Sequence, residues 1–146
     1  MQFNNKKDQE LYFRSLYYLN SGSQGECYLD KNKKVMYKLL FYYDGLTKEE
    51  LFRFSDIKNK TFIWPTEEIM VESKIVGYMM PYRKAKNLCD LNPMSINLND
   101  LETAIIKAYA DIQLLTDNNV RIYDVMYNTL YSRRKFSIID TTDYSS

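Results

Sequence analysis

Histidine is absent from this chain of 146 residues, and cysteine occurs only as Cys27 and Cys89. The lack of histidine excludes histidine-based catalytic triads, histidine-ligated zinc and a histidine general base. Two cysteines cannot build a metal cage by themselves, and they do not indicate a disulfide framework. Any catalysis by this chain must therefore use Asp, Glu, Lys, Tyr or a bound ion.

Strong net charge and long apolar runs are also lacking. Lys and Arg number 20 against 19 Asp and Glu, so the net charge is +1. This balance argues against a dedicated nucleic-acid-binding protein, which normally carries a basic excess. No uncharged apolar run approaches the length that spans a bilayer, and the polar residues 1–7 lack the apolar stretch of a signal peptide. We therefore expect no membrane span and a cytoplasmic location.

The composition that remains is ordinary for a globular domain, with 45% hydrophobic and 27% charged residues. A folded chain of this size buries roughly two-thirds of the surface that its unfolded form exposes. The length therefore supports a single domain with a real core.

Strand-like patterns dominate the first half of the chain. We expect the residues before Leu11 to form a loose polar leader, and the β-prone aromatic run from Leu11 to Leu19 predicts a strand near Tyr17. Further strands are predicted at residues 26–29, 35–40, 68–72 and 75–80, and residues 81–93 are predicted to be loop-like. A turn with two glycines, Asn20 to Gly25, separates the first two strands.

Helical patterns follow. Thr47 as N-cap, with Glu50 as its capping-box partner, predicts a helix whose apolar face includes Leu51, Phe54 and Ile57. A longer helix is predicted from the N-cap Asn99 to residues 117–119. Its apolar residues recur at spacings of three and four: Leu101, Ile105, Ala108, Ile112 and Leu115. A β-rich first part and a helical later part indicate an α+β fold with two lobes.

Four polar features could carry chemistry. The glycine turn would let backbone N–H groups approach a phosphate closely, because no Cβ intervenes. Lys38 lies within an otherwise apolar strand, where its ammonium group needs a partner. Asp124 and Asn128 lie in a loop after the long helix, and Asp140 ends an apolar strand. Phosphoryl transfer requires oxygen ligands for Mg²⁺ and a carboxylate near the attacking hydroxyl, and these residues can supply both.

The order of these features resembles the protein kinase fold. Asn20-Ser21-Gly22-Ser23-Gln24-Gly25-Glu26-Cys27 is similar to the glycine-rich loop, and Val35-Met36-Tyr37-Lys38 to the motif that contains the strand lysine. Gly77 to Tyr82 resembles the hinge, Tyr123 to Leu130 the catalytic loop, and Ile138-Ile139-Asp140-Thr141 the metal-binding segment. The resemblance is strongest to small divergent bacterial and phage kinase-like proteins and to short effector kinases.

The resemblance implies a kinase-like α+β domain with a β-rich N-lobe at about 10–80, a hinge at about 80–86 and a partial, truncated helical C-lobe at about 87–146. It implies ATP and Mg²⁺ as cofactors and a protein as substrate or partner, in the cytoplasm or in a host cytoplasm if the chain is an effector. Lys38 and Asp124 would be catalytic, and Asn128 and Asp140 would bind the metal. The nucleotide would contact Asn20, Gly22, Gly25, Cys27, Lys38, Met80 and Leu130, and Glu50 would hold Lys38.

Departures from the family pattern leave alternatives open. Asp124 and Asn128 are four residues apart where the family usually has five, so Tyr123 is an alternative match for the catalytic position. Glu49 is an alternative partner for Lys38. Asn20 replaces the first loop glycine, and Thr141-Thr142 replaces the Phe-Gly that follows the metal-binding Asp. A phosphotransferase and a pseudokinase that acts as a binding scaffold both fit this pattern.

Overall fold

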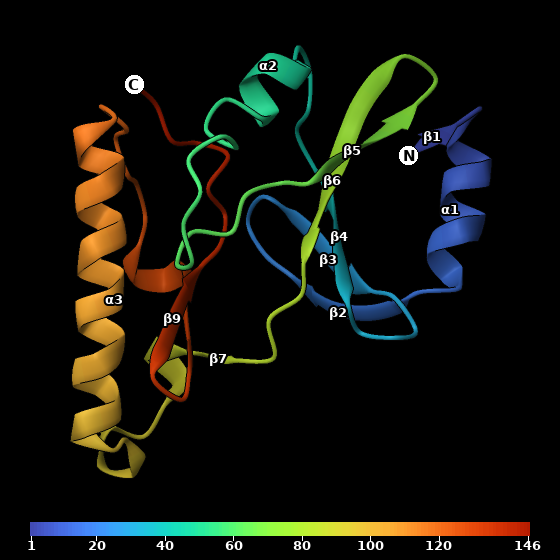
Figure 1. Ribbon diagram of the computed structural model, residues 1–146. Helices are drawn as coiled ribbons and strands as arrows, with labels where there is room; N and C mark the ends of the chain where they lie inside the picture. Colours follow the sequence, from blue (N-terminus) through green and yellow to red (C-terminus); the bar gives the residue numbers. More distant parts are fainter. The chain divides into compact units, whose positions relative to one another are not determined.

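The computed structural model describes residues 1–146 and divides into two compact units. Unit 1 comprises Met1–Ser55 and Pro65–Tyr82, and unit 2 comprises Asp56–Trp64 and Arg83–Ser146. Each unit contains its own sheet and at least one helix (Figure 1). The predicted α+β fold is thereby confirmed.

Unit 1 is built on a six-stranded sheet in the order β1-β5-β6-β4-β3-β2. Its strands are β1 (Gln2–Phe3), β2 (Tyr17–Ser21), β3 (Gly25–Leu29), β4 (Val35–Leu40), β5 (Glu67–Val71) and β6 (Lys74–Pro81). β1 pairs with β5 in parallel, and all other neighbours are antiparallel. The predicted strand at residues 35–40 has the same bounds in the structure, and those at 26–29, 68–72 and 75–80 differ by one residue at one or both ends.

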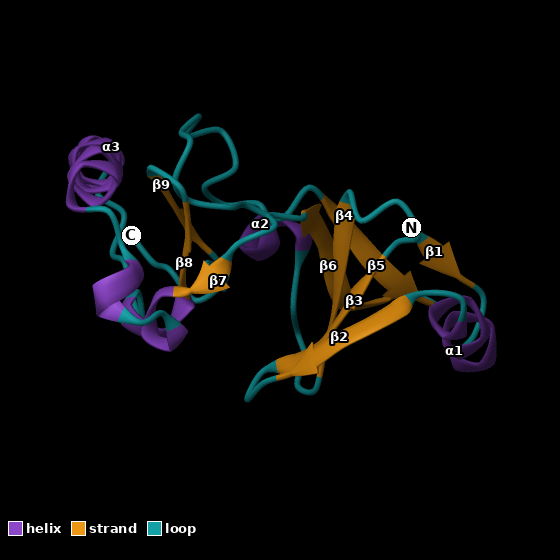
Figure 2. Cartoon of the chain, turned by 90° about the horizontal axis from the view of Figure 1, so that it is seen from below, coloured by secondary structure: helices purple, strands orange, loops and turns teal.

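Helix α1 (Lys6–Arg14) replaces the loose leader that we predicted and includes the start of the aromatic run, whereas the strand predicted near Tyr17 is confirmed as β2. The Asn5 side chain caps the helix by accepting a hydrogen bond from Asp8 N at 2.8 Å. Phe13 is buried, and its ring packs edge-on against the rings of Tyr28 and Tyr37 at 5.0 and 5.7 Å. The aromatic residues that suggested a strand therefore anchor a helix to the sheet. Figures 1 and 2 show α1 beside β1.

Helix α2 (Lys48–Leu51) begins where the capping pattern predicts. The Thr47 side chain accepts a hydrogen bond from Glu50 N at 3.2 Å. The helix ends after one turn, so Phe54 and Ile57 lie beyond it and form no helical face with Leu51. This part of the prediction is wrong.

Unit 2 contains a three-stranded sheet in the order β7-β8-β9 and the long helix α3. Its elements are β7 (Lys86–Asn87), the 3-10 turns η1 (Leu88–Asp90), η2 (Pro93–Ser95) and η3 (Met126–Asn128), α3 (Leu98–Asp117), β8 (Thr129–Ser132) and β9 (Lys135–Ile138). β7, η1 and the start of η2 lie in the segment 81–93 that we expected to be loop-like.

Helix α3 differs from its prediction at its start, and its predicted apolar face is confirmed at Ala108 and Leu115. Asn97, not Asn99, is the N-cap, and its side chain accepts a hydrogen bond from Asp100 N at 3.0 Å. The buried residues of the helix are Ala104, Ala108 and Leu115. Ile105 is half exposed, because the small Ala104 is the residue that meets the unit 2 core. No helix of the chain is both long enough and apolar enough to cross a membrane.

Candidate functional site

Lys38 lies in the middle of the unit 1 sheet and is only 4% exposed. It is opposite Cys27 on β3 and Tyr78 on β6, and Cys27 is opposite Asn20 on β2. Residues directly opposite one another in paired strands project from the same face. Asn20, Cys27, Lys38 and Tyr78 therefore share one face of the sheet, which we call the lysine face. Met80 follows Tyr78 by two positions on β6, so it belongs to this face as well.

The other face of the sheet is covered by α1. Tyr37, Ile69 and Val76 are buried on it with Phe13 of the helix. Because neighbours along a strand alternate between faces, Tyr37 and Lys38 project in opposite directions. The side chains of the lysine face therefore do not belong to the core beneath α1.

The glycine turn contains two glycines with different surroundings. The N–H of Gly22 donates to the carbonyl of Gly25 at 2.9 Å, which closes the turn. A Cβ at Gly25 would lie 2.0 Å from the Leu39 carbonyl oxygen, whereas a Cβ at Gly22 would meet nothing within 4 Å. Gly25 is therefore required by the close approach of β4, and only Gly22 leaves open space beside the backbone.

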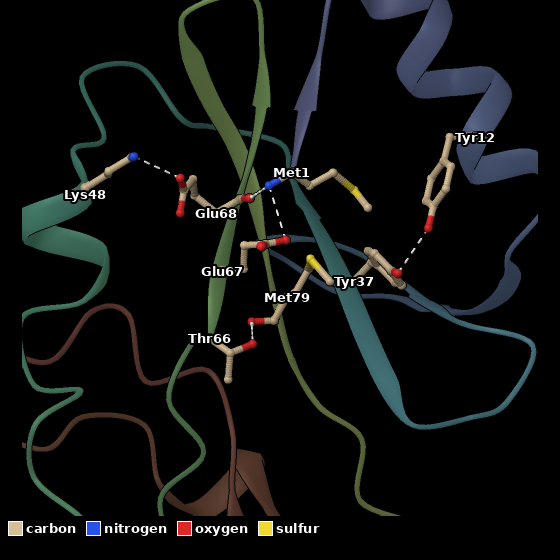
Figure 3. A network of polar contacts seen from close by, with 8 residues as sticks. All are labelled: Met1, Tyr12, Tyr37, Lys48, Thr66, Glu67, Glu68 and Met79. Carbon is tan, nitrogen blue, oxygen red and sulfur yellow. Dashed lines mark hydrogen bonds and ion pairs between the residues drawn. The ribbon is translucent and has the colours of Figure 1, made fainter.

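The two candidate glutamates on α2 are exposed. The backbone amide of Glu50 bonds Thr47, and neither Glu49 nor Glu50 forms an ion pair through its carboxylate. Lys48 instead bonds Glu68 of β5, with Nζ and Oε1 3.0 Å apart (Figure 3). The pairing of Lys38 with Glu50 stays a prediction, and the ion pair that ties α2 to the sheet is one that sequence reasoning missed.

Glu68 extends the lysine face by one strand, because it is opposite Tyr78. The α-amino group of Met1 donates to the Glu68 carbonyl at 3.0 Å and lies 3.2 Å from Glu67 Oε2 (Figure 3). The pKa of Glu68 is lowered, first by a hydrogen bond from its own backbone amide and then by Lys48. No motif marks Glu68 in the sequence, since only the strand register brings it to this face.

In unit 2, the loop after α3 brings Asp124 and Asn128 together. Asn128 Nδ2 donates to the carbonyl of Asp124 at 2.9 Å, and Asn128 N donates to Val125 at 3.1 Å. These two hydrogen bonds close the loop between Asp124 and Asn128, which are four residues apart in the sequence. Asp124 is exposed and has φ of +54°, a left-handed conformation that Asp tolerates better than most residues. The alternative residue, Tyr123, has its hydroxyl 3.1 Å from Ser145 Oγ.

Asp140 lies near Asn128, since both residues flank the paired ends of β8 and β9. Thr129 is opposite Ile138 in this hairpin, and Ile139 N donates to the carbonyl of Asn128 at 3.0 Å. Asp140 is half-buried and also left-handed, with φ of +57°. Leu130, the predicted adenine contact, is half-buried on β8. The structure thus brings Asp124, Asn128 and Asp140 to one end of one hairpin.

Tyr144 is the residue of this region that sequence reasoning missed. It is 4% exposed, it packs edge-on against Phe62 and Trp64, and its hydroxyl has no hydrogen-bond partner. Burial raises the pKa of Tyr144 most, and the carboxylates of Asp143, Asp140 and Asp124 raise it further. An unbonded hydroxyl close to several carboxylates has no sequence signature.

The donor set for a metal consists of oxygen atoms. No group of three or more Cys, Asp or Glu side chains is placed to hold a metal ion by itself. Mg²⁺ at nucleotide sites usually takes one or two carboxylates and completes its shell with phosphate oxygens and water. Asn128 uses its Nδ2 within the loop, so its Oδ1 remains an acceptor. Asn128 and Asp140 are therefore oxygen donors of the type that Mg²⁺ takes.

Comparison with solved structures defines the class of fold. The autoinhibited serine kinase domain of the giant muscle protein titin matches with a TM-score of 0.63 at 16% sequence identity. The match covers 93% of this chain and 47% of that chain, so this chain spans about half of the titin kinase domain. This likeness shows a protein kinase-like fold. No protein-family model matches the chain, and a search of curated proteins found no match.

Proposed function

We propose that this protein binds ATP with Mg²⁺ and transfers the γ-phosphoryl group to a hydroxyl, that of a Ser or Thr of a protein. The observation that carries the proposal is the grouping of Asp124, Asn128 and Asp140 at one end of the β8–β9 hairpin, in a chain with a kinase-like fold. Phosphoryl transfer depends mainly on positioning and on charge stabilisation, and these residue types provide both.

Lys38 binds the α- and β-phosphates in this proposal. Its position in the centre of a sheet holds the side chain on a rigid element, and the neighbouring Cys27 and Asn20 belong to the same face. Backbone amides of the turn that contains Gly22 and Gly25 approach the phosphates. Met80 offers its backbone to the adenine, and Leu130 contacts the ring.

Asp140 and Asn128 hold the magnesium ion through a carboxylate oxygen and an amide oxygen. Such an ion would supply positive charge to the phosphate oxygens during transfer. A backbone hydrogen bond ties the two segments together, because the Asn128 carbonyl accepts from Ile139 N, the neighbour of Asp140.

Asp124 orients the acceptor hydroxyl and takes up its proton. The hydroxyl oxygen forms a bond to the γ-phosphorus, the bond to the β,γ-bridging oxygen breaks, and ADP leaves. The exposure of Asp124 allows a protein substrate to reach the carboxylate. The Asn128 side chain holds the Asp124 backbone in place at 2.9 Å.

A second candidate function is a pseudokinase that binds nucleotide or protein without phosphotransfer. The observation that favours it is α2, a single turn whose Glu49 and Glu50 are exposed and bind no cation. Active kinases hold the strand lysine with a helix carboxylate. We also propose that the protein is related to small bacterial and phage kinase-like proteins or to effector kinases.

Transfer of labelled γ-phosphate from ATP tests this proposal, with the protein itself and a mixed Ser/Thr peptide library as acceptors. Asp124→Asn keeps a residue that tolerates the left-handed backbone, and we expect it to lower the rate by about 10²-fold or more. Asp117→Asn, at the end of α3, is the matched control and should retain the rate. No transfer by the wild type would contradict the enzyme proposal and favour the pseudokinase.

A further inference from the structure

A cavity of about 830 Å³ lies in unit 1 between α1 and the sheet. The sheet residues that line it include Glu26, Tyr28 and Leu39, and Glu26 is opposite Leu39 in the register of β3 and β4. These positions alternate with Cys27 and Lys38, so the cavity opens on the face opposite the lysine face. The proposed ATP-binding residues do not use this cavity.

Aromatic rings form one wall of the cavity. The ring of Tyr28 meets Phe13 at 5.0 Å and Tyr18 at 5.5 Å, both edge-on. All three residues line the cavity, together with Phe41 and Tyr43. Such a wall suits a planar ring, which can stack on or pack against aromatic side chains. The volume is within the range of small-molecule sites, about 300–1,000 Å³.

Gln9 of α1 is a polar residue among those that line the cavity. It lines the cavity and is only 6% exposed, yet its side-chain amide forms no hydrogen bond with the protein. The amide atoms are not among the fully buried polar atoms without a partner, so they reach water, which a ligand can replace. The amide offers a donor and an acceptor side by side, the pair that recognises the edge of a nucleobase.

The charged residues of the cavity leave one cation without a carboxylate. Lys6 pairs with Glu10 at 4.0 Å, and Glu26 accepts a hydrogen bond from the Tyr28 hydroxyl at 2.8 Å. Arg14 also lines the cavity, at the C-terminal turn of α1, and it forms no ion pair. A guanidinium group in this setting favours an anionic group such as a phosphate.

We propose that this cavity is a second small-molecule site, which binds a nucleoside monophosphate or a similar planar heteroaromatic ring with an anionic tail. The ring packs along the wall of Phe13 and Tyr28, and its polar edge bonds the Gln9 amide. The phosphate bonds Arg14, and a ribose hydroxyl donates to the Glu26 carboxylate. This site is independent of the ATP site proposed on the other face.

Calorimetric titration with adenosine 5′-monophosphate, without Mg²⁺, tests the site. Adenosine, which lacks the phosphate, and ribose 5-phosphate, which lacks the base, should each bind at least tenfold more weakly. Gln9→Leu and Arg14→Gln should each weaken binding of the monophosphate about tenfold. Gln113→Leu and Arg53→Gln are matched controls outside the cavity and should bind as the wild type does.

Lys38→Ala separates this proposal from the proposed ATP site. If the monophosphate binds the Lys38→Ala variant as it binds the wild type, the second site is supported. If Lys38→Ala abolishes binding and Arg14→Gln does not, the ligand occupies the lysine face, and the second site is overturned while the ATP proposal stands. Absence of binding to the wild type at 5 mM ligand also overturns it. Arg14 is exposed, so Arg14→Gln should fold and still tests the site if Gln9→Leu does not fold.

Discussion

The two units hold their candidate functional residues in different ways. Lys38 of unit 1 is a central strand residue that is 4% exposed, and paired strands on both sides fix its position. Asp124 and Asp140 of unit 2 lie outside helices and strands, and both have left-handed φ values, of +54° and +57°. Sheet pairing therefore positions the phosphate-binding candidate, whereas backbone conformation positions the metal-binding and catalytic candidates.

The two units should respond differently to substitution. In unit 1, a substitution acts through the close packing of strands. In unit 2, a substitution acts through the loop, where Asp and Asn accept a left-handed conformation that β-branched residues resist. Asparagine is therefore the substitution that removes the charge of Asp124 or Asp140 with the least change to the backbone.

The largest effect that we expect tests the packing in unit 1. Gly25→Ala places a Cβ 2.0 Å from the Leu39 carbonyl oxygen, so β3 and β4 must separate. We expect the free energy of unfolding to fall by about 3 kcal/mol, the upper part of the range for overpacked sites. Urea denaturation followed by circular dichroism measures this loss.

Gly22→Ala is the control in the same turn. Its Cβ would meet nothing within 4 Å, and we expect a change within about 0.5 kcal/mol. Equal destabilisation by the two substitutions would show that the turn, and not the approach of β4, limits the stability of this hairpin.

The next largest effects that we expect concern one buried tyrosine in each unit. The hydroxyl of Tyr37 in unit 1 is bonded to the hydroxyl of Tyr12 at 3.2 Å, whereas that of Tyr144 in unit 2 has no partner. Tyr37→Phe should destabilise the protein by about 1 kcal/mol, and Tyr144→Phe should be neutral or stabilise it by about 1 kcal/mol. Thermal unfolding of both variants checks the opposite signs, and loss of stability in Tyr144→Phe would contradict them.

The pH dependence of stability follows from the same residues. Burial raises the pKa of Tyr37 and Tyr144 above the ordinary value, and that of Tyr28 to about 12. A raised pKa contributes stability that is complete below the unfolded pKa near 10 and is lost at higher pH. The free energy of unfolding should therefore fall above pH 10. The fall should be less steep in Tyr144→Phe, and equal slopes would contradict this assignment.

The smallest effect concerns the ion pair between α2 and β5. Lys48 is partly exposed, so Lys48→Met should cost only about 0.5 kcal/mol. The variant should raise the pKa of Glu68, which is now lowered. A lowered pKa contributes stability above the unfolded value of 4.5 that is lost as the pH falls through the folded pKa. NMR titration of the Glu68 carboxyl group measures this change, and Lys31→Met is the control.

Much of the fold could be predicted from local patterns. Continuous apolar residues flanked by polar turns indicate β4 correctly, and Thr47 with Glu50 marks the start of α2. Helix α1 could not be recognised, because Tyr12 and Phe13 favour strands by propensity and become helical through contacts with distant strands. The buried face of α3 could be predicted at Ala108 and Leu115 but not at Ala104, since Ala104 gives a weaker apolar signal than Ile105.

The candidate site was predictable only in part, for the same reason. The positions of Asp124, Asn128 and Asp140 follow from the order of a helix, a loop and a hairpin, which the sequence displays. Glu68 reaches its face through the register of β5 with β6, and Tyr144 packs against Phe62, which is far away in the sequence. Contacts between residues so far apart leave no local sequence pattern.

Calorimetric measurement of ATP affinity with and without Mg²⁺ tests the central claim, that Lys38 binds phosphate and Asp140 binds the metal. We expect Mg²⁺ to strengthen ATP binding by the wild type at least tenfold, or about 1.4 kcal/mol. Lys38→Ala should weaken binding under both conditions, and Asp140→Asn should remove the effect of Mg²⁺ alone. ATP binding that ignores Mg²⁺ in the wild type, or that keeps its Mg²⁺ dependence in Asp140→Asn, would contradict the account.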